Sequence, residues 1–134
     1  MEFHQGRLLD HVHLRVRDLE ESKAFYRAVL ESLGRSITFE SESAFAADEL
    51  YVSADGEPTA NLHLAFQAAD HDAVRRFHEA GLAAGGTDNG RPGPRDYHPG
   101  YFGAYLVDPD GNNVEAVHHG PATRSTDSVV IRPA

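Results

Sequence analysis

The chain has 134 residues, a length that suits one domain able to bury a core without disulfide bonds. Twelve Lys and Arg against 21 Asp and Glu give a formal charge of -9, which argues against nucleic acid and anionic membranes as partners. The absence of cysteine excludes a thiolate metal site and a cysteine nucleophile.

No part of the sequence predicts export or membrane insertion. Residues 1–7, MEFHQGR, lack the apolar run of a signal peptide, and no later run approaches the length of a membrane span. We therefore expect a soluble, cytoplasmic protein.

An internal repeat organises the chain. Residues 11–34 align without a gap on residues 63–86, and six of the 24 aligned positions are identical. The identical pairs are His11/His63, Asp18/Asp70, Phe25/Phe77, Ala28/Ala80, Leu30/Leu82 and Gly34/Gly86. The repeat predicts two copies of one supersecondary unit.

Each copy opens with an alternating segment. In residues 12–16 the apolar side chains occupy every second position, and His11 and His13 lie on the opposite, polar face. Residues 62–68 alternate in the same way, with His63 on the polar face. This period of two predicts strands with one buried face.

A helix is predicted after each of these strands. Asp18 and Asp70 stand at N-cap positions, and Gly34 and the pair Gly85-Gly86 stand where a left-handed residue ends a helix. Between cap and glycine, apolar residues recur at helical spacing. The stripe comprises Phe25, Tyr26, Val29, Leu30 and Leu33 in the first copy, and Val74, Phe77 and Leu82 in the second.

Further strands are predicted after each helix. Their ranges are 37–40, 43–47 and 50–53 in the first half, and 101–107 and 114–118 in the second. The pattern predicts an α+β fold of two tandem β-α-β-β-β modules, which form a paired, cup-shaped mixed sheet with helices on the outer faces.

One domain is expected over residues 1–134. Module one spans 8–56, module two spans 60–120 and a tail spans 121–134. Residues 129–131 of the tail are apolar and are expected to add an edge strand, to pack on a partner or to fray.

Three side chains suit a divalent metal site. His11 and His63 open equivalent strands, and Glu115 stands inside a strand, where β-propensity disfavours glutamate. Taken singly, each is typical of a surface or core residue. Together they form a two-histidine, one-carboxylate set with open positions, which suits Fe, Ni, Zn, Co or Mn in the cleft between the modules.

The same segments resemble a known family. LDHVHLRV, DLEESKAFYRAVLESLG, NLHLAF and above all YLVDPDGNNVEAV are similar to the vicinal oxygen chelate superfamily. That superfamily includes glyoxalase I, extradiol dioxygenases, fosfomycin-resistance thiol transferases and bleomycin-resistance proteins. The resemblance covers residues 8 to 120, and it extends to small bacterial glyoxalase-like proteins of unassigned activity. It implies that His11, His63 and Glu115 hold a metal that chelates two neighbouring oxygens of a substrate.

The branches of the family imply different catalytic residues. Glyoxalase I adds a second carboxylate from the first module, for which Glu49 is a candidate; the alternative is a solvated loop residue. Tyr105, ten residues before Glu115, matches a tyrosine of the dioxygenases and the thiol transferases, or is a plain strand aromatic. His13 replaces a threonine of the thiol transferases, and is either a base or a polar residue lining a wet cleft.

Residues 90–101, GRPGPRDYHPGY, predict a specificity loop because they are rich in glycine and proline. The loop offers rings and donors for a planar or carbonyl-bearing ligand, although these rings alternatively anchor the loop to the sheet. The candidate substrate-binding residues are Arg95, Tyr97, His98 and Tyr101.

The resemblance, together with the two-histidine, one-carboxylate set, implies a metal-dependent glyoxalase-like enzyme, either a lyase or isomerase or a dioxygenase. The expected substrate is a small dicarbonyl, hydroxy-ketone or catechol-like compound. The alternatives are a metal-free small-molecule-binding or drug-sequestering protein of the bleomycin-resistance type, and a catalytically silent relative. The resemblance and the open sheet edges predict a homodimer, in which ligands of one site can come from two chains.

Overall fold

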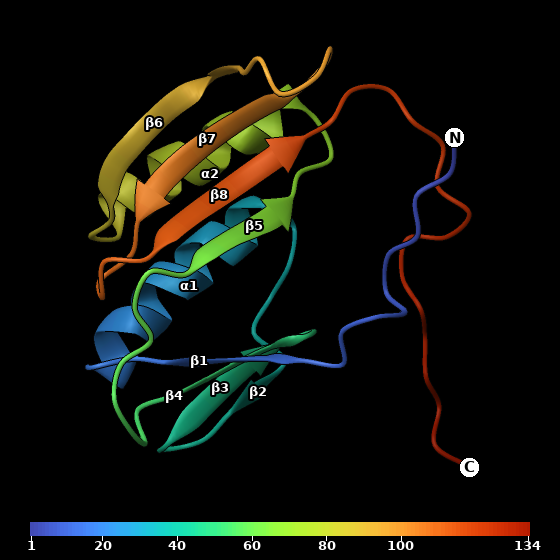
Figure 1. Ribbon diagram of the computed structural model, residues 1–134. Helices are drawn as coiled ribbons and strands as arrows, with labels where there is room; N and C mark the ends of the chain where they lie inside the picture. The colour runs from blue at the N-terminus through green and yellow to red at the C-terminus, as the bar shows by residue number, and fades with distance from the viewer.

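The computed structural model describes residues 1–134 and contains two four-stranded sheets and two helices (Figure 1). The strand order is β1-β4-β3-β2 in one sheet and β5-β8-β7-β6 in the other. In each sheet the first strand pairs in parallel with the last, and the other neighbours are antiparallel. The predicted α+β fold of two similar modules is confirmed.

The elements have the following bounds in chain order. They are β1 Val12–Arg15, α1 Leu19–Ser32, β2 Phe39–Glu40, β3 Ala44–Ala47, β4 Leu50–Ser53, β5 His63–Gln67, α2 His71–Ala83, β6 Thr87–Pro94, β7 Phe102–Val107 and β8 Asn113–His118.

The predicted caps define both helices. The Asp18 side chain accepts a hydrogen bond from the amide of Glu21, and the Asp70 side chain accepts one from the amide of Ala73. After the helices, Gly34 has φ 77° and Gly85 has φ 99°, the left-handed conformation that glycine adopts without strain.

The two helices pack against one another, and 20 buried residues from both modules form one core. The apolar stripe of α1 is buried as predicted at Phe25 and Val29. The prediction is wrong at Leu82 of α2, which is 42% exposed. The neighbouring Gly81 faces Val29 and Leu106 instead, since one residue along a helix turns the side chain by about 100°.

Strand β6 corrects the predicted loop. Its residues 87–94 pair with β7, so the first part of the segment 90–101 is strand and only residues 95–101 form a loop. Two prolines fit there because β6 is an edge strand, paired on one side only. Register shifts around Gly90, which has φ 153°, absorb the irregular sequence.

The turn between β7 and β8 ties the modules together. Tyr26 of α1 donates a hydrogen bond from its hydroxyl to Asp108 Oδ2 at 2.6 Å. The amide of Arg17 donates to Asp110 Oδ1 at 3.0 Å. The DPDGN sequence therefore fixes how the two halves of the chain meet.

The terminal segments are extended and run side by side, apart from the two sheets (Figure 1). Arg124 links them to the body, donating to Gln67 Oε1 at 2.7 Å and to Gln5 Oε1 at 3.4 Å. Residues 129–131 form no strand, so the edge strand, one of the alternatives for the tail, is absent from this chain. Neither helix is long and apolar enough to cross a membrane.

Candidate metal and ligand site

Glu115 and His63 form a pair on one face of the second sheet. Strand β8 lies between β5 and β7, and Glu115 is 1% exposed. His63 Nε2 lies 2.7 Å from Glu115 Oε1, while 56% of the His63 side chain is exposed. A buried carboxylate is thus joined to an imidazole that remains open to a ligand.

Tyr101 holds the second oxygen of the same carboxylate. Its hydroxyl donates to Glu115 Oε2, and burial, followed by this hydrogen bond, raises the pKa of Tyr101. Gly103 makes room for this contact, because a Cβ there would lie 3.2 Å from Oε2 and 3.2 Å from the Tyr101 ring. Tyr101, Gly103 and Tyr105 share one face of β7 and of the residue before it.

Tyr105 lies opposite Glu115 in the β7–β8 ladder and is 8% exposed. Its hydroxyl is the only buried side-chain polar atom without a hydrogen-bond partner. Burial, and then the nearby Tyr101, Tyr97 and Glu115, raise the pKa of Tyr105 far above its ordinary value. An unpartnered buried hydroxyl costs about 1–3 kcal/mol, so the Tyr105 hydroxyl is a candidate to bind a ligand atom.

Within one chain, His11 does not lie beside His63 and Glu115. It lies just before β1, its side chain is 63% exposed, and its Nδ1 is 2.6 Å from Asp10 Oδ1. No three His, Asp or Glu side chains of the chain are arranged to hold a metal ion. The structure therefore joins His63 with Glu115 and leaves His11 outside the pair.

His13 belongs to a separate cluster in module one. Its Nε2 lies 2.7 Å from the hydroxyl of Ser53, which donates to Asp55 Oδ1 at 2.7 Å. That hydrogen bond, followed by the charges of Arg15 and His13, lowers the pKa of Asp55. Since the Ser53 proton goes to Asp55, His13 donates from Nε2 and keeps a lone pair on Nδ1. Sequence reasoning missed Ser53 and Asp55, although alternation along 50–53 signals which side chains share a face.

The strand register assigns Glu49 no place beside the pair. In module two, Glu115 lies opposite Ala65; the equivalent neighbours in module one are Tyr51 and His13. Tyr51 therefore occupies the position that corresponds to Glu115, and its ring meets the His13 ring edge-on at 5.0 Å. Glu49 is exposed in the turn before β4.

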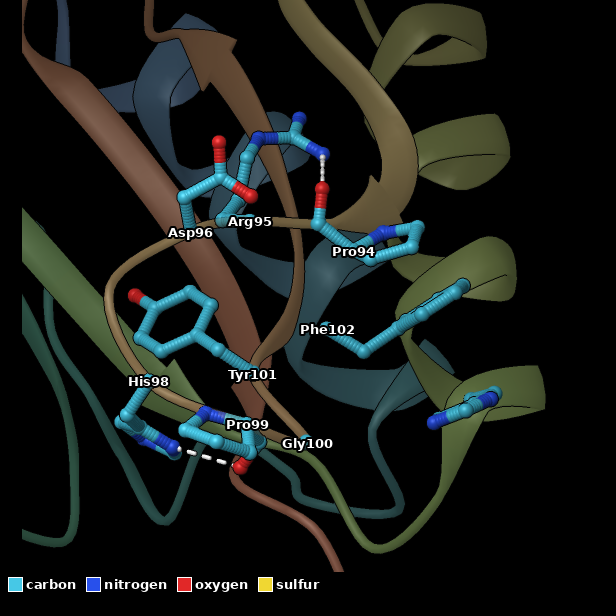
Figure 2. Close-up of a pocket in the computed structure, with 9 residues that line it drawn as sticks. Pro94, Arg95, Asp96, His98, Pro99, Gly100, Tyr101 and Phe102 are labelled. Carbon is cyan, nitrogen blue, oxygen red and sulfur yellow. Dashed lines mark hydrogen bonds between the residues drawn. The ribbon is translucent and has the colours of Figure 1, made fainter.

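A hollow of about 480 Å³ opens beside the loop 95–101 (Figure 2). The rings of Tyr101 and Phe102 point to opposite sides of the backbone, as strand alternation requires. Of the predicted loop residues, Arg95, His98 and Tyr101 line the hollow. Tyr97 is exposed and meets Tyr101 edge-on at 4.9 Å.

The guanidinium of Arg95 forms hydrogen bonds within its own turn. Its guanidinium donates to the carbonyl oxygens of Arg91, Gly93 and Pro94 at 2.7–3.1 Å, and lies 5.2 Å from the centre of the Tyr105 ring. The contact with the ring is a cation–π interaction. Arg95 thus shapes the loop and covers Tyr105.

Comparison with known proteins identifies the fold family. Residues 8–116 match the model of the Glyoxalase/Bleomycin resistance protein/Dioxygenase superfamily. The chain belongs to this superfamily. Its members bind small molecules, often bind divalent metals and often dimerise. The resemblance inferred from the sequence motifs is confirmed.

Solved structures of superfamily members share the architecture. A glyoxalase/bleomycin resistance protein from Albidiferax ferrireducens T118 is 35% identical, with a TM-score of 0.73 over 83% of this chain and 98% of that one. A family enzyme from Burkholderia phytofirmans PsJN is 20% identical, with a TM-score of 0.64 over 82% and 97% of the two chains. A glyoxalase-related enzyme from Fulvimarina pelagi is 19% identical, with a TM-score of 0.64 over 90% and 99%. No curated protein matches the chain.

The paired donors fit a metal of the kind that superfamily members bind. Two neighbouring ligands about 2.1 Å from one ion lie about 3 Å apart, and His63 Nε2 and Glu115 Oε1 are 2.7 Å apart. A small separation of the two atoms is enough to admit an ion. Imidazole and carboxylate both suit the borderline divalent metals. One chain supplies two of the three predicted ligands.

Proposed function

We propose that this superfamily member is a metal-dependent glyoxalase-like enzyme whose site is completed by a second copy of the chain. His63 and Glu115 bind the divalent ion, and His11 of the partner subunit supplies the third ligand. The substrate is a small dicarbonyl, hydroxy-ketone or catechol-like compound. The observation that carries the proposal is the buried Glu115 carboxylate, paired with a half-open imidazole beside the unpartnered Tyr105 hydroxyl.

The exposure of His11 and of the terminal segments supports the second copy. His11 lies just before β1, forms no metal-holding group with His63 and Glu115 of its own chain, and is exposed, so it is free to meet another chain. Contiguous exposed apolar side chains are typical of interaction surfaces. Those on the terminal segments are Met1, Phe3, Leu8, Leu9, Val129, Val130 and Ile131.

The chain's own residues have separate roles in holding the ion, orienting its ligands and transferring a proton. When bound, the ion supplies Lewis-acid stabilisation of charge on the two substrate oxygens. Tyr101 orients Glu115 by donating to Oε2, and the Tyr105 hydroxyl donates to a substrate oxygen. His13 is the base: its Nδ1 lone pair is free while Nε2 is tied to Ser53, and it lies two residues after His11, on the module that reaches this site from the partner subunit.

Titration of untagged protein with Fe, Ni, Zn, Co and Mn tests the metal. We expect tight uptake that His63→Ala and Glu115→Gln each weaken by at least about tenfold, with His4→Ala as the matched control. A wild-type protein that takes up none of these ions at His63 contradicts the proposal. Turnover of methylglyoxal with glutathione, compared with a catechol panel, then separates the isomerase from the dioxygenase.

A metal-free binding protein is the second candidate, favoured by one observation. Both oxygens of Glu115 already accept hydrogen bonds inside one chain, from His63 and Tyr101. If the protein binds its ligand without a metal, a chelator that removes metal ions leaves the ligand affinity unchanged, whereas Tyr105→Phe still lowers that affinity. The same titration therefore decides between the two functions.

A further inference from the structure

Two other histidines face one another beside the loop 95–101. His98 lies in the loop 95–101 and His119 follows β8 directly. His98 Nε2 is 2.9 Å from His119 Nδ1, and the two ring planes are inclined by 20° with their centres 5.1 Å apart, so the rings meet edge to edge. Both side chains are exposed, so an ion reaches them from solvent.

The hydrogen bonds fix which nitrogen of His98 is free. His98 Nδ1 lies 2.9 Å from the carbonyl oxygen of Pro99 and must donate to it, because a carbonyl only accepts (Figure 2). The neutral ring then has its lone pair on Nε2, directed at His119. An imidazole anchored through one nitrogen to a backbone carbonyl is the usual form of a metal-binding histidine.

His119 becomes the second donor of a pair by a change of tautomer together with a rotation of both exposed imidazole rings, which turns the two lone pairs toward a shared ion. It now donates from Nδ1 to His98; moving its proton to Nε2 turns Nδ1 into a second lone pair facing the first. Two nitrogens 2.9 Å apart match the spacing of neighbouring ligands on one ion, about 3 Å. No rearrangement of the backbone is required.

We propose that His98 and His119 form a second divalent-metal site, distinct from the His63–Glu115 site, which clips the loop to the end of β8. Two imidazoles with water in the other positions suit Zn, Ni or Cu. The Tyr101 ring meets both imidazoles edge-on, at 5.4 Å from His98 and 5.1 Å from His119. Tyr101 also donates a hydrogen bond to Glu115, the carboxylate of the first site. A metal bound by His98 and His119 therefore restricts the motion of the residue that orients Glu115.

Calorimetric titration of the full, untagged chain with Zn²⁺ alone and with Ni²⁺ alone tests the second site. The expected result is a binding event that survives in His63→Ala, and that His98→Ala and His119→Ala each weaken by about tenfold or more. His4→Ala, which removes another exposed histidine, is the control. Hydrogen exchange of residues 95–101 should slow when Zn²⁺ is added to wild type and stay unchanged in His119→Ala.

Two outcomes overturn the proposal. One is loss of all Zn²⁺ and Ni²⁺ binding in His63→Ala, and the other is titration of His98→Ala and His119→Ala indistinguishable from wild type. Failure of the proposed function is separable, since it removes the event that depends on His63 and leaves the event that depends on His98.

Discussion

Two buried phenols of this chain have opposite surroundings. The hydroxyl of Tyr26 donates to the buried carboxylate of Asp108, whereas the hydroxyl of Tyr105 has no partner. A partnered buried group stabilises the fold, and an unpartnered one is retained at a cost. We therefore assign Tyr26 to stability and Tyr105 to ligand binding.

Replacing each tyrosine by phenylalanine separates these roles. Tyr26→Phe should lower the free energy of unfolding by about 1–3 kcal/mol, because Asp108 then loses a donor inside the core. Tyr105→Phe should not lower it, and should raise it by up to about 1–3 kcal/mol because the unpartnered buried hydroxyl is removed, while substrate binding becomes weaker. Urea unfolding of both variants measures the difference, and the reverse order of stabilities contradicts the assignment.

The pKa of Asp88 makes the free energy of unfolding depend on pH. Hydrogen bonds from His78, first, and from the Gly90 amide lower the pKa of Asp88 from 3.8. A lowered carboxyl pKa stabilises the folded state above that value, and the contribution disappears as the pH falls through the folded-state pKa. Between about pH 5 and pH 3, Asp88→Asn should lose less unfolding free energy than wild type. Equal pH slopes in the two proteins would show that the pair contributes nothing.

At the scale of the elements, helix α2 approaches the rest of the core through a glycine. A Cβ at Gly81 would lie 3.0 Å from Val29 Cγ1 and would collide with the Leu106 side chain. Glycine costs about 1 kcal/mol of helix propensity, so the helix accepts this loss for close packing.

Gly81→Ala tests whether packing outweighs propensity. The added methyl should lower the free energy of unfolding by about 1–3 kcal/mol, despite the better helix former, because the core has no room for it. Glu79→Ala, on the same helix, is the control and should change little. Thermal unfolding that shows Gly81→Ala to be more stable than wild type contradicts the packing argument.

Helix-capping residues and apolar alternation predicted the elements that are determined by their own local sequence. The caps at Asp18 and Asp70 and the alternation of β1 and β5 indicated their own structures, and the unexpected glutamate inside β8 indicated a carboxylate that the structure pairs with His63. Strand β6 was missed because its glycines and prolines indicate a turn; an edge strand tolerates them only through pairing with β7, which is a tertiary contact.

The site was predictable in its residues more than in its contacts. Glu115 and His63 could be found because each breaks or repeats a pattern. The hydrogen bond of Tyr101 to Glu115 and the cluster around His13 depend on strand register, which periodicity alone does not give.

At the scale of the whole molecule, the repeat places equivalent histidines on equivalent strands but does not say which modules face each other. In one chain the helices pack together and His11 stays outside the pair. In a repeat of this kind, a cleft can form between the two modules of one chain or between modules of two chains. Sequence similarity between the modules does not distinguish the two arrangements.

A dimer follows if the site is shared. Sedimentation equilibrium of wild type should give twice the chain mass, because association would bury apolar residues that both terminal segments expose in the single chain. Leu9→Asp with Val130→Asp should shift the equilibrium toward monomer and weaken metal binding at His63 together. A wild type that remains monomeric at all concentrations argues against the shared site.

Mixing two inactive variants tests the shared site most directly. His11→Ala and His63→Ala are each expected to lose the Glu115-linked metal, since every site in either homodimer lacks one histidine. A dimer formed from one chain of each kind carries one intact site, so a fully exchanged mixture should recover about a quarter of the wild-type sites. Metal titration that finds no more binding in the mixture than in the separate variants contradicts the account.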